Sequence, residues 1–187
     1  MNKKCLYEII ENDKKIYLTN NKIKKLYYIV TNHNNYTFYK AIKYSRLYRF
    51  YLENRKSLID KLKFIYFSRK NNIYGRKNNI ELYGKFDNNL ILYHSGIVIN
   101  KNACLGNNIK LHGQNCIGSK GNEKKAPIIG DNVDIGFGAI IIGDIKIAKN
   151  VIIGANSVVN KDILEEGCIV VGVPAKKIDG GKNGTKN

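Results

Sequence analysis

The sequence predicts a mainly β protein, in which a solenoid of hexapeptide repeats follows an α-helical N-terminal extension. The first observation behind this prediction is an aliphatic residue at every sixth position. Neither a helix nor a plain strand has that period, whereas a coil with three six-residue sides does, and stacked coils form a parallel β-helix. The ten repeating residues are Ile99, Leu105, Leu111, Ile117, Ile129, Ile135, Ile141, Ile147, Ile153 and Val159.

The second observation is what surrounds these residues. Glycine directly follows several of the aliphatic positions, as in Leu105-Gly106 and Ile117-Gly118. Glycine and asparagine tolerate the tight backbone of coil corners. Residues Ile80, Phe86 and Leu92 extend the six-residue spacing backwards, so the solenoid is expected to begin near Ile80.

The period breaks in two places. Leu92 and Ile99 are seven residues apart, which leaves one extra residue beside His94. The polar, glycine-rich stretch 118–127 interrupts the second half of the pattern and is expected to leave the solenoid as a loop. Irregularities in a regular scaffold often carry function, so both breaks mark candidate functional positions.

Before the solenoid, the third observation is a series of segments with helical spacing. Helices are expected around Tyr7 and Ile10 and over 22–30, 39–54 and 57–68, and 71–79 is expected to be a linker. The predicted division is therefore a helical extension over 1–77, a β-helix over 78–178 and a disordered tail over 179–187.

Charge is concentrated in the extension. The chain of 187 residues has a net charge of +17, and residues 1–77 carry 19 Lys and Arg against 5 Asp and Glu, a net charge of +14. Such an extension can meet a membrane surface, nucleic acid or an anionic substrate. The alternative is that these charges only form solvated helix faces in a chain rich in lysine. The helices that combine aromatic and basic residues are expected to pack against the end of the solenoid or against another subunit.

Composition also bears on location and on cysteine chemistry. The chain has no apolar run long enough to span a membrane and no signal-type apolar core, so a cytoplasmic protein is expected. None of its four cysteines forms a Cys-x-x-Cys pair, and Cys104 and Cys116 are expected to be small packing residues.

Two histidines fall within the solenoid. His94 and His112 are 18 residues apart, which is one coil, so they are expected on neighbouring coils near one edge. A histidine can take a proton near neutral pH, although a hydrogen-bonded turn histidine is the alternative for each. Two histidines without a cysteine cluster do not favour a metal site.

Residues 80–178 resemble the hexapeptide-repeat acyltransferases, in particular serine acetyltransferases and relatives that O-acetylate bacterial surface polysaccharides. The similar segments are 94–100, 112–118, 129–159 and 172–176. The resemblance implies a left-handed parallel β-helix, a homotrimer, and acetyl-CoA bound between subunits. No metal is expected, because the solenoid has only two histidines and no cysteine cluster. It also implies that His94 is the general base, with the donor bound by Gly118, Gly138, Ala139, Ala155, Lys176 and Lys177.

The departures from the serine acetyltransferase pattern concern the acceptor. Tyr93 stands where those enzymes have an Asp, Lys125-Ala126 where they have Arg-His, and Asn79 where an Asp orients the base. Glu81 could replace that Asp, and His112 could serve the acceptor.

We therefore expect an acetyl-CoA-dependent O-acetyltransferase that acts on a sugar hydroxyl of a surface polysaccharide or its precursor. Serine O-acetylation is the alternative. A non-catalytic solenoid that binds nucleic acid through its basic extension is a third hypothesis, and no nucleic-acid partner is expected under the first two. The basic extension could bring the enzyme to an anionic glycan or to a membrane surface.

Overall fold

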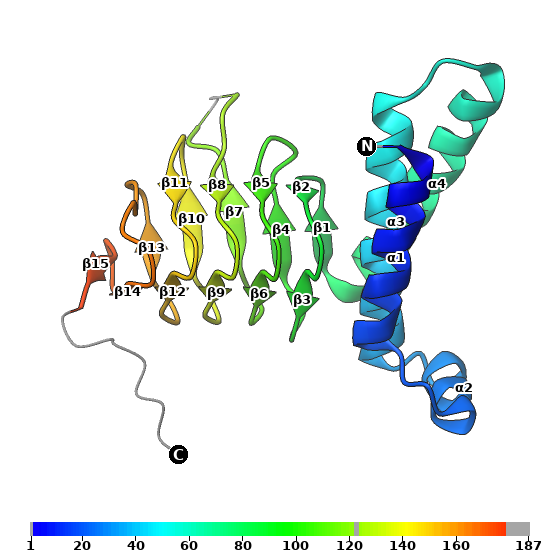
Figure 1. Ribbon diagram of the computed structural model, residues 1–187, viewed down its shortest axis with the longest axis horizontal. Helices are drawn as coiled ribbons and strands as arrows, with labels where there is room; N and C mark the ends of the chain where they lie inside the picture. The colour runs from blue at the N-terminus through cyan, green and yellow to red at the C-terminus, as the bar shows by residue number, and fades with distance from the viewer. Residues whose placement is uncertain (1, 122–123, 179–187) are drawn as a thin grey trace. The chain divides into compact units, whose positions relative to one another are not determined.

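A computed structural model describes residues 2–121 and 124–178 (Figure 1). The chain divides into two compact units, Met1–Tyr83 and Gly84 to the C-terminus. The predicted disordered tail, 179–187, lies outside the described residues. None of the described helices is long and apolar enough to cross a membrane.

The first unit contains four helices and one short strand, and the helical extension is thereby confirmed. The elements are α1 (Lys3–Tyr17), α2 (Lys22–Val30), α3 (Asn34–Glu53), α4 (Leu58–Asn78) and β1 (Ile80–Leu82). Ser57 caps α4, since its hydroxyl accepts from the backbone N–H of Asp60 and the Asp60 carboxylate accepts from the backbone N–H of Ser57.

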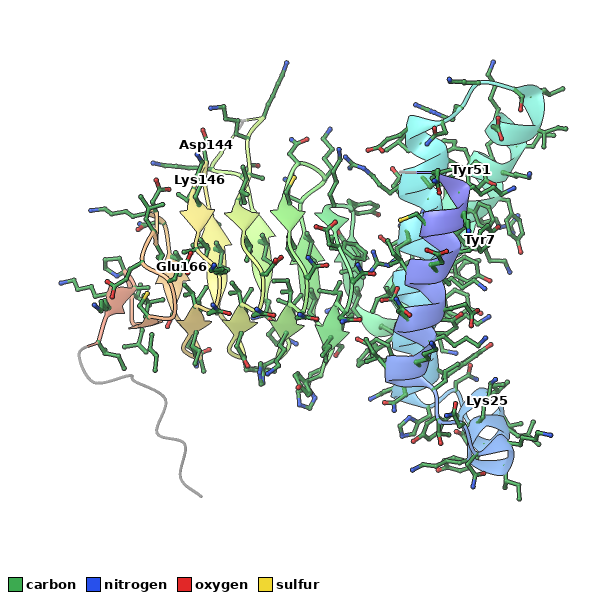
Figure 2. The ribbon with its side chains drawn as sticks, viewed as in Figure 1. Tyr7, Lys25, Tyr51, Asp144, Lys146 and Glu166 are labelled. Carbon is green, nitrogen blue, oxygen red and sulfur yellow. The ribbon has the colours of Figure 1, made fainter. Side chains whose placement is uncertain are left out.

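The core of the first unit centres on α3. Phe38, Ile42 and Leu47 are nearly inaccessible to solvent, and so is Tyr51, which is labelled in Figure 2 and stacks on Phe67 of α4 at a centroid distance of 5.3 Å. A buried ion pair joins α1 to α3, with Arg46 Nε 2.6 Å from Asp13 Oδ2. Burial raises the pKa of the Asp13 carboxyl, although Arg46 opposes that effect.

The predicted linker over 71–79 is wrong, because α4 continues to Asn78. Asn71 and Asn78 are buried, and the Asn78 side chain accepts from Thr37 Oγ1 of α3 at 2.7 Å and donates to the Tyr74 carbonyl. Asn79 then ends the helix in the left-handed conformation at φ 52°. Polar composition alone could not reveal these partners.

The second unit is a parallel β-solenoid, as predicted (Figure 1). One sheet runs β4-β7-β10-β13, a second β2-β5-β8-β11, and a third β3-β6-β9-β12-β14, with β15 antiparallel at its end. The strands are β2 (Lys85–Phe86), β3 (Ile91–Leu92), β4 (Ile97–Ile99), β5 (Cys104–Leu105), β6 (Lys110–Leu111), β7 (Cys116–Gly118), β8 (Ile128–Ile129), β9 (Asp134–Ile135), β10 (Ile140–Ile142), β11 (Lys146–Ile147), β12 (Ile152–Ile153), β13 (Val158–Val159), β14 (Ile169–Val171) and β15 (Lys176–Lys177).

The six-residue period does build the core. Each of the ten repeating aliphatic residues is at most 3% exposed. Three sides make one coil, so residues such as Leu105 and Ile129 pair across adjacent coils in the same sheet. The stacked aliphatic side chains form the main hydrophobic core of this unit.

One corner of the solenoid is an asparagine ladder. Asn89, Asn108, Asn132 and Asn150 all adopt positive φ, between 57° and 62°. Each side-chain amide donates to the next in line, with N–O distances of 2.7, 2.8 and 3.0 Å. Asparagine tolerates the left-handed region, so it both permits the turn and links successive coils.

The two breaks in the period have the predicted consequences. The described part of 118–127 leaves the coil between β7 and β8, so the step from Ile117 to Ile129 spans twelve residues. The extra residue between Leu92 and Ile99 lies in the turn that carries His94, and Gly96 has φ 79° there.

Candidate active site at a corner of the solenoid

The turns after β3, β6 and β9 place the predicted histidines at one corner. Register pairs Ile91 with Lys110 and Leu92 with Leu111. Continuing this register puts Tyr93, and not His94, beside His112, and the two rings have centroids 4.7 Å apart. The expectation of neighbouring coils at one edge is therefore correct, but the two histidines are offset by one residue.

His94 lies beside a glycine and an aromatic ring of the next two coils. It is exposed, and its ring meets Phe137 edge-on with a centroid distance of 6.2 Å. A Cβ on Gly113 would stand 2.6 Å from the His94 Cβ, so glycine is required at that position for this packing. An exposed imidazole fixed at its base by close packing can accept a proton from a bound hydroxyl.

His112 has a carboxylate partner. Its Nε2 lies 2.8 Å from Asp134 Oδ1 of β9, and the other Asp134 oxygen is 3.3 Å from Lys110 Nζ. The side chain of His112 is 40% exposed, so one edge of the ring stays open to solvent while the other is held. A carboxylate on one ring nitrogen fixes the orientation of the imidazole and leaves Nδ1 available.

The residues predicted to bind acetyl-CoA differ in their exposure to solvent. Gly118 ends β7 opposite Ile142, and Gly138 turns at φ 73° beside Asn156. Ala155 is exposed, but the Ala139 side chain points into the coil and is fully buried. Ala139 therefore offers no side-chain surface to a ligand, because the last residue before a strand alternates towards the core.

Lys176 and Lys177 form β15, and both are exposed. Lys177 Nζ is 2.7 Å from Glu165 Oε1, so this lysine already has an anionic neighbour. Lys176 lies opposite Val171 in the antiparallel pair of β14 and β15. A lysine side chain can bind a phosphate, and Lys177 differs from Lys176 in its ion pair with Glu165.

The structure also locates residues that depart from the serine acetyltransferase pattern on the acceptor side. Asn79 is the C-cap of α4, and Glu81 on β1 is exposed and lines a cavity of about 270 Å³ in the first unit with Asn72, Arg76 and Tyr83. The role of Glu81 as a partner of the base stays a prediction.

In the loop after β7, Ala126 is 4% exposed and so presents no polar group to solvent. Its neighbour Lys125 is 2.6 Å from Asp144, which Figure 2 labels near the end of β10.

The cysteines and the residue types that bind metals can also be placed. The four cysteines are free thiols, and burial raises the pKa of Cys116, which disfavours a thiolate nucleophile. Among residues 2–121 and 124–178, no three His, Cys, Asp or Glu side chains are grouped as metal ligands would be.

Sequence reasoning missed Asp134 and Phe137 as neighbours of the two histidines. Lys110 pairs with Asp134 at a separation of 24 residues, because the loop after β7 lengthens that coil. Counting 18 residues on from Lys110 therefore does not reach its partner in the next coil. A count that allows for the one extra residue beside His94 and for the six residues added between Ile117 and Ile129 gives both residues.

Comparisons with known proteins agree with the helical unit and the β-solenoid. No family model matches the chain. Serine acetyltransferase of Staphylococcus aureus is 41% identical over 93 residues, which cover 48% of this chain and 43% of that protein. The chain thus spans less than half the length of the curated relatives that it matches.

Solved structures match over a larger part of the chain. Soybean serine acetyltransferase complexed with serine is 25% identical, with a TM-score of 0.72 over 94% of this chain and 70% of that one. The Neisseria gonorrhoeae serine acetyltransferase is 30% identical, with a TM-score of 0.68 over 94% of this chain and 68% of that one. The chain therefore belongs to the serine acetyltransferase family.

Proposed function

We propose that the protein transfers the acetyl group of acetyl-CoA to a hydroxyl group, with L-serine as the first candidate acceptor. The observation that carries the proposal is the exposed His94 imidazole, which is held at the break in the solenoid beside Gly113 and Phe137. Support for serine comes from the family: the soybean relative is known in complex with serine. A serine acetyltransferase of this fold is also known in complex with CoA.

In this proposal His94 acts as the general base. Its free ring nitrogen accepts the proton of the acceptor hydroxyl while the hydroxyl oxygen forms a bond to the thioester carbonyl carbon. The carbon–sulfur bond then breaks, and the imidazolium returns its proton to the departing CoA sulfur. The protein supplies position and a base, whereas the thioester supplies the driving force.

His112 and Asp134 would orient the acceptor. Asp134 holds one nitrogen of His112 at 2.8 Å, and Tyr93 covers the ring face at 4.7 Å. The remaining nitrogen is free to bond a polar group of the acceptor, one residue along the corner from His94. Paired carboxylate and imidazole groups of this kind set the direction of a hydrogen bond.

The donor would lie along small residues and end at β15. Ala155 is exposed and Gly118 and Gly138 are half-buried, so the narrow pantetheine arm would pass along them, and Lys176 would meet the 3′-phosphate. We also propose that the protein is a homotrimer, with the donor site completed by a neighbouring copy, as the resemblance to the hexapeptide-repeat acyltransferases implies.

Thiol release from acetyl-CoA, with L-serine as acceptor, tests this proposal. We expect serine-dependent release by the full chain and its loss in His94→Ala. His33→Asn is the matched control, since His33 caps α3 in the first unit and asparagine can keep the cap. Absence of serine-dependent release, with His94→Ala behaving as the unaltered chain, would contradict the proposal.

A sugar hydroxyl is the second candidate acceptor. Tyr93 and Ala126 replace an Asp and a His of the serine acetyltransferase pattern, and Ala126 is buried. A serine molecule carries two opposite charges that need partners, whereas a neutral sugar hydroxyl does not. Release of thiol that depends on a sugar nucleotide or an oligosaccharide, is insensitive to serine and is lost in His94→Ala would identify this acceptor class.

A further inference from the structure

Helix α2 presents its apolar side to solvent. Ile23, Leu26, Tyr27 and Val30 are 82%, 60%, 57% and 71% exposed, and no residue of this helix is buried. Their spacing of three, four and seven residues places all four side chains on one stripe of the helix. In an ordinary globular protein such a stripe faces the core.

The opposite side of α2 faces the rest of the helical unit. Tyr28 and Lys25 are half-buried, and the Tyr28 ring stacks on His33 at a centroid distance of 4.3 Å. The helix also contacts α3. The helix is therefore fixed through its polar and aromatic side, with the apolar stripe (Ile23, Leu26, Tyr27 and Val30) turned outward.

Positive charge flanks the apolar stripe. On a helix with 3.6 residues per turn, Lys22 lies beside Leu26 at one margin and Lys24 lies beyond Tyr27 at the other. The surrounding chain repeats this character, because residues 14–52 contain nine Lys and Arg and no Asp or Glu. Lysines at both margins can reach outward to anions while the apolar side chains sink below them.

The size and chemistry of this stripe discriminate between possible occupants. A stable protein–protein interface takes about 20–30 residues a side, and the stripe offers four apolar side chains. A nucleic acid would use the lysines but not the apolar residues. An anionic lipid surface uses both, since apolar groups enter the acyl boundary and lysines meet the headgroups.

We propose that α2 docks the protein onto an anionic lipid membrane surface, through the apolar stripe and its flanking lysines. This proposal does not rest on the acceptor or on the acetyl-transfer step. It concerns attachment to a surface, not crossing of the membrane.

The test measures binding of the full chain to vesicles by sedimentation. Vesicles of phosphatidylcholine with phosphatidylglycerol are compared with vesicles of phosphatidylcholine alone. We expect binding to the anionic vesicles and about a fivefold loss in the partition coefficient for each of Lys22→Ala and Lys24→Ala. The double variant Ile23→Ser, Val30→Ser should lose about tenfold or more.

A control removes an apolar group of similar exposure that is flanked by acidic residues. Leu164 is 69% exposed and precedes Glu165 and Glu166, so Leu164→Ser should bind vesicles as the unaltered chain does. Circular dichroism and thermal unfolding show that each variant keeps its fold.

Three results would overturn the proposal. The first is no binding to anionic vesicles, and the second is equal loss in the control and in the stripe variants. The third is a stripe variant that binds vesicles normally but has a lower mass in solution, because the occupant would then be a second copy of this chain.

Discussion

Gly113→Ala tests the packing that fixes His94. Gly113 has φ 112°, a conformation that costs a residue with a side chain about 1–3 kcal/mol. Its new Cβ would also stand 2.6 Å from the His94 Cβ and 3.2 Å from Phe137 Cε2, whereas ordinary contacts begin at 3.4 Å. Both Cβ atoms are attached to backbone, so neither can rotate away, and the turn that carries His94 must move by about 1 Å.

A displacement of about 1 Å at a reacting group can lower the rate on the order of 100-fold. We therefore expect kcat for acetyl transfer to fall by about that factor, with little change in KM for acetyl-CoA. Steady-state kinetics gives the two constants, and denaturant unfolding gives the stability of the variant.

Gly167→Ala is the control for backbone strain alone. Gly167 has φ 70°, and a Cβ there would meet nothing within 4 Å. It should lose about 1–3 kcal/mol of unfolding free energy without a change in kcat. A folded Gly113→Ala protein with the kcat of the unaltered chain, or an equal fall in kcat for Gly167→Ala, would refute the assigned role of this packing.

Three further predictions concern the two units separately. Arg46→Met should cost about 3–5 kcal/mol of unfolding free energy, because Asp13 would keep a buried charge without its partner. Adding Asp13→Leu should recover most of that loss. A double-mutant cycle by urea unfolding measures the recovery, and its absence would contradict the prediction. Burial raises the pKa of Tyr39 to about 12, so its contribution to stability is complete below pH 10 and is lost between about pH 10 and 12; Tyr39→Phe should flatten the stability profile there, and an unchanged profile would count against the assignment. Lys176→Ala should raise KM for acetyl-CoA about tenfold and leave KM for the donor without its 3′-phosphate unchanged; an equal rise for both donors would exclude the phosphate contact.

The coil architecture could be predicted because the period itself carries the information. A six-residue spacing of aliphatic side chains has only one regular solution, so Ile99 and Ile117 could be assigned to the core without coordinates. The same logic located the break beside His94. It failed for Asp134, since the loop after β7 changes the coil length and so the partner of His112.

Local composition was a poorer guide in the first unit. The polar string 71–79 carries no apolar pattern, and yet it is helical to Asn78 because Thr37 and the Tyr74 carbonyl satisfy the Asn78 side chain. Contacts between residues 41 positions apart leave no trace in a window of sequence. The sequence likewise predicted a helix over the residues of α2, but it did not show that the apolar side chains of this helix face solvent.

The sequence by itself determined the solenoid, the helical extension and the corner that holds both histidines, because a repeated inward residue fixes the backbone path of each coil. Only the tertiary structure decided which side chains meet at that corner. Register between coils places Tyr93 on His112, Gly113 under His94 and Asp134 on His112 Nε2. Those neighbours lie on adjacent coils. The six-residue period shows that the coils stack, but it does not show how an inserted residue shifts one coil against the next coil.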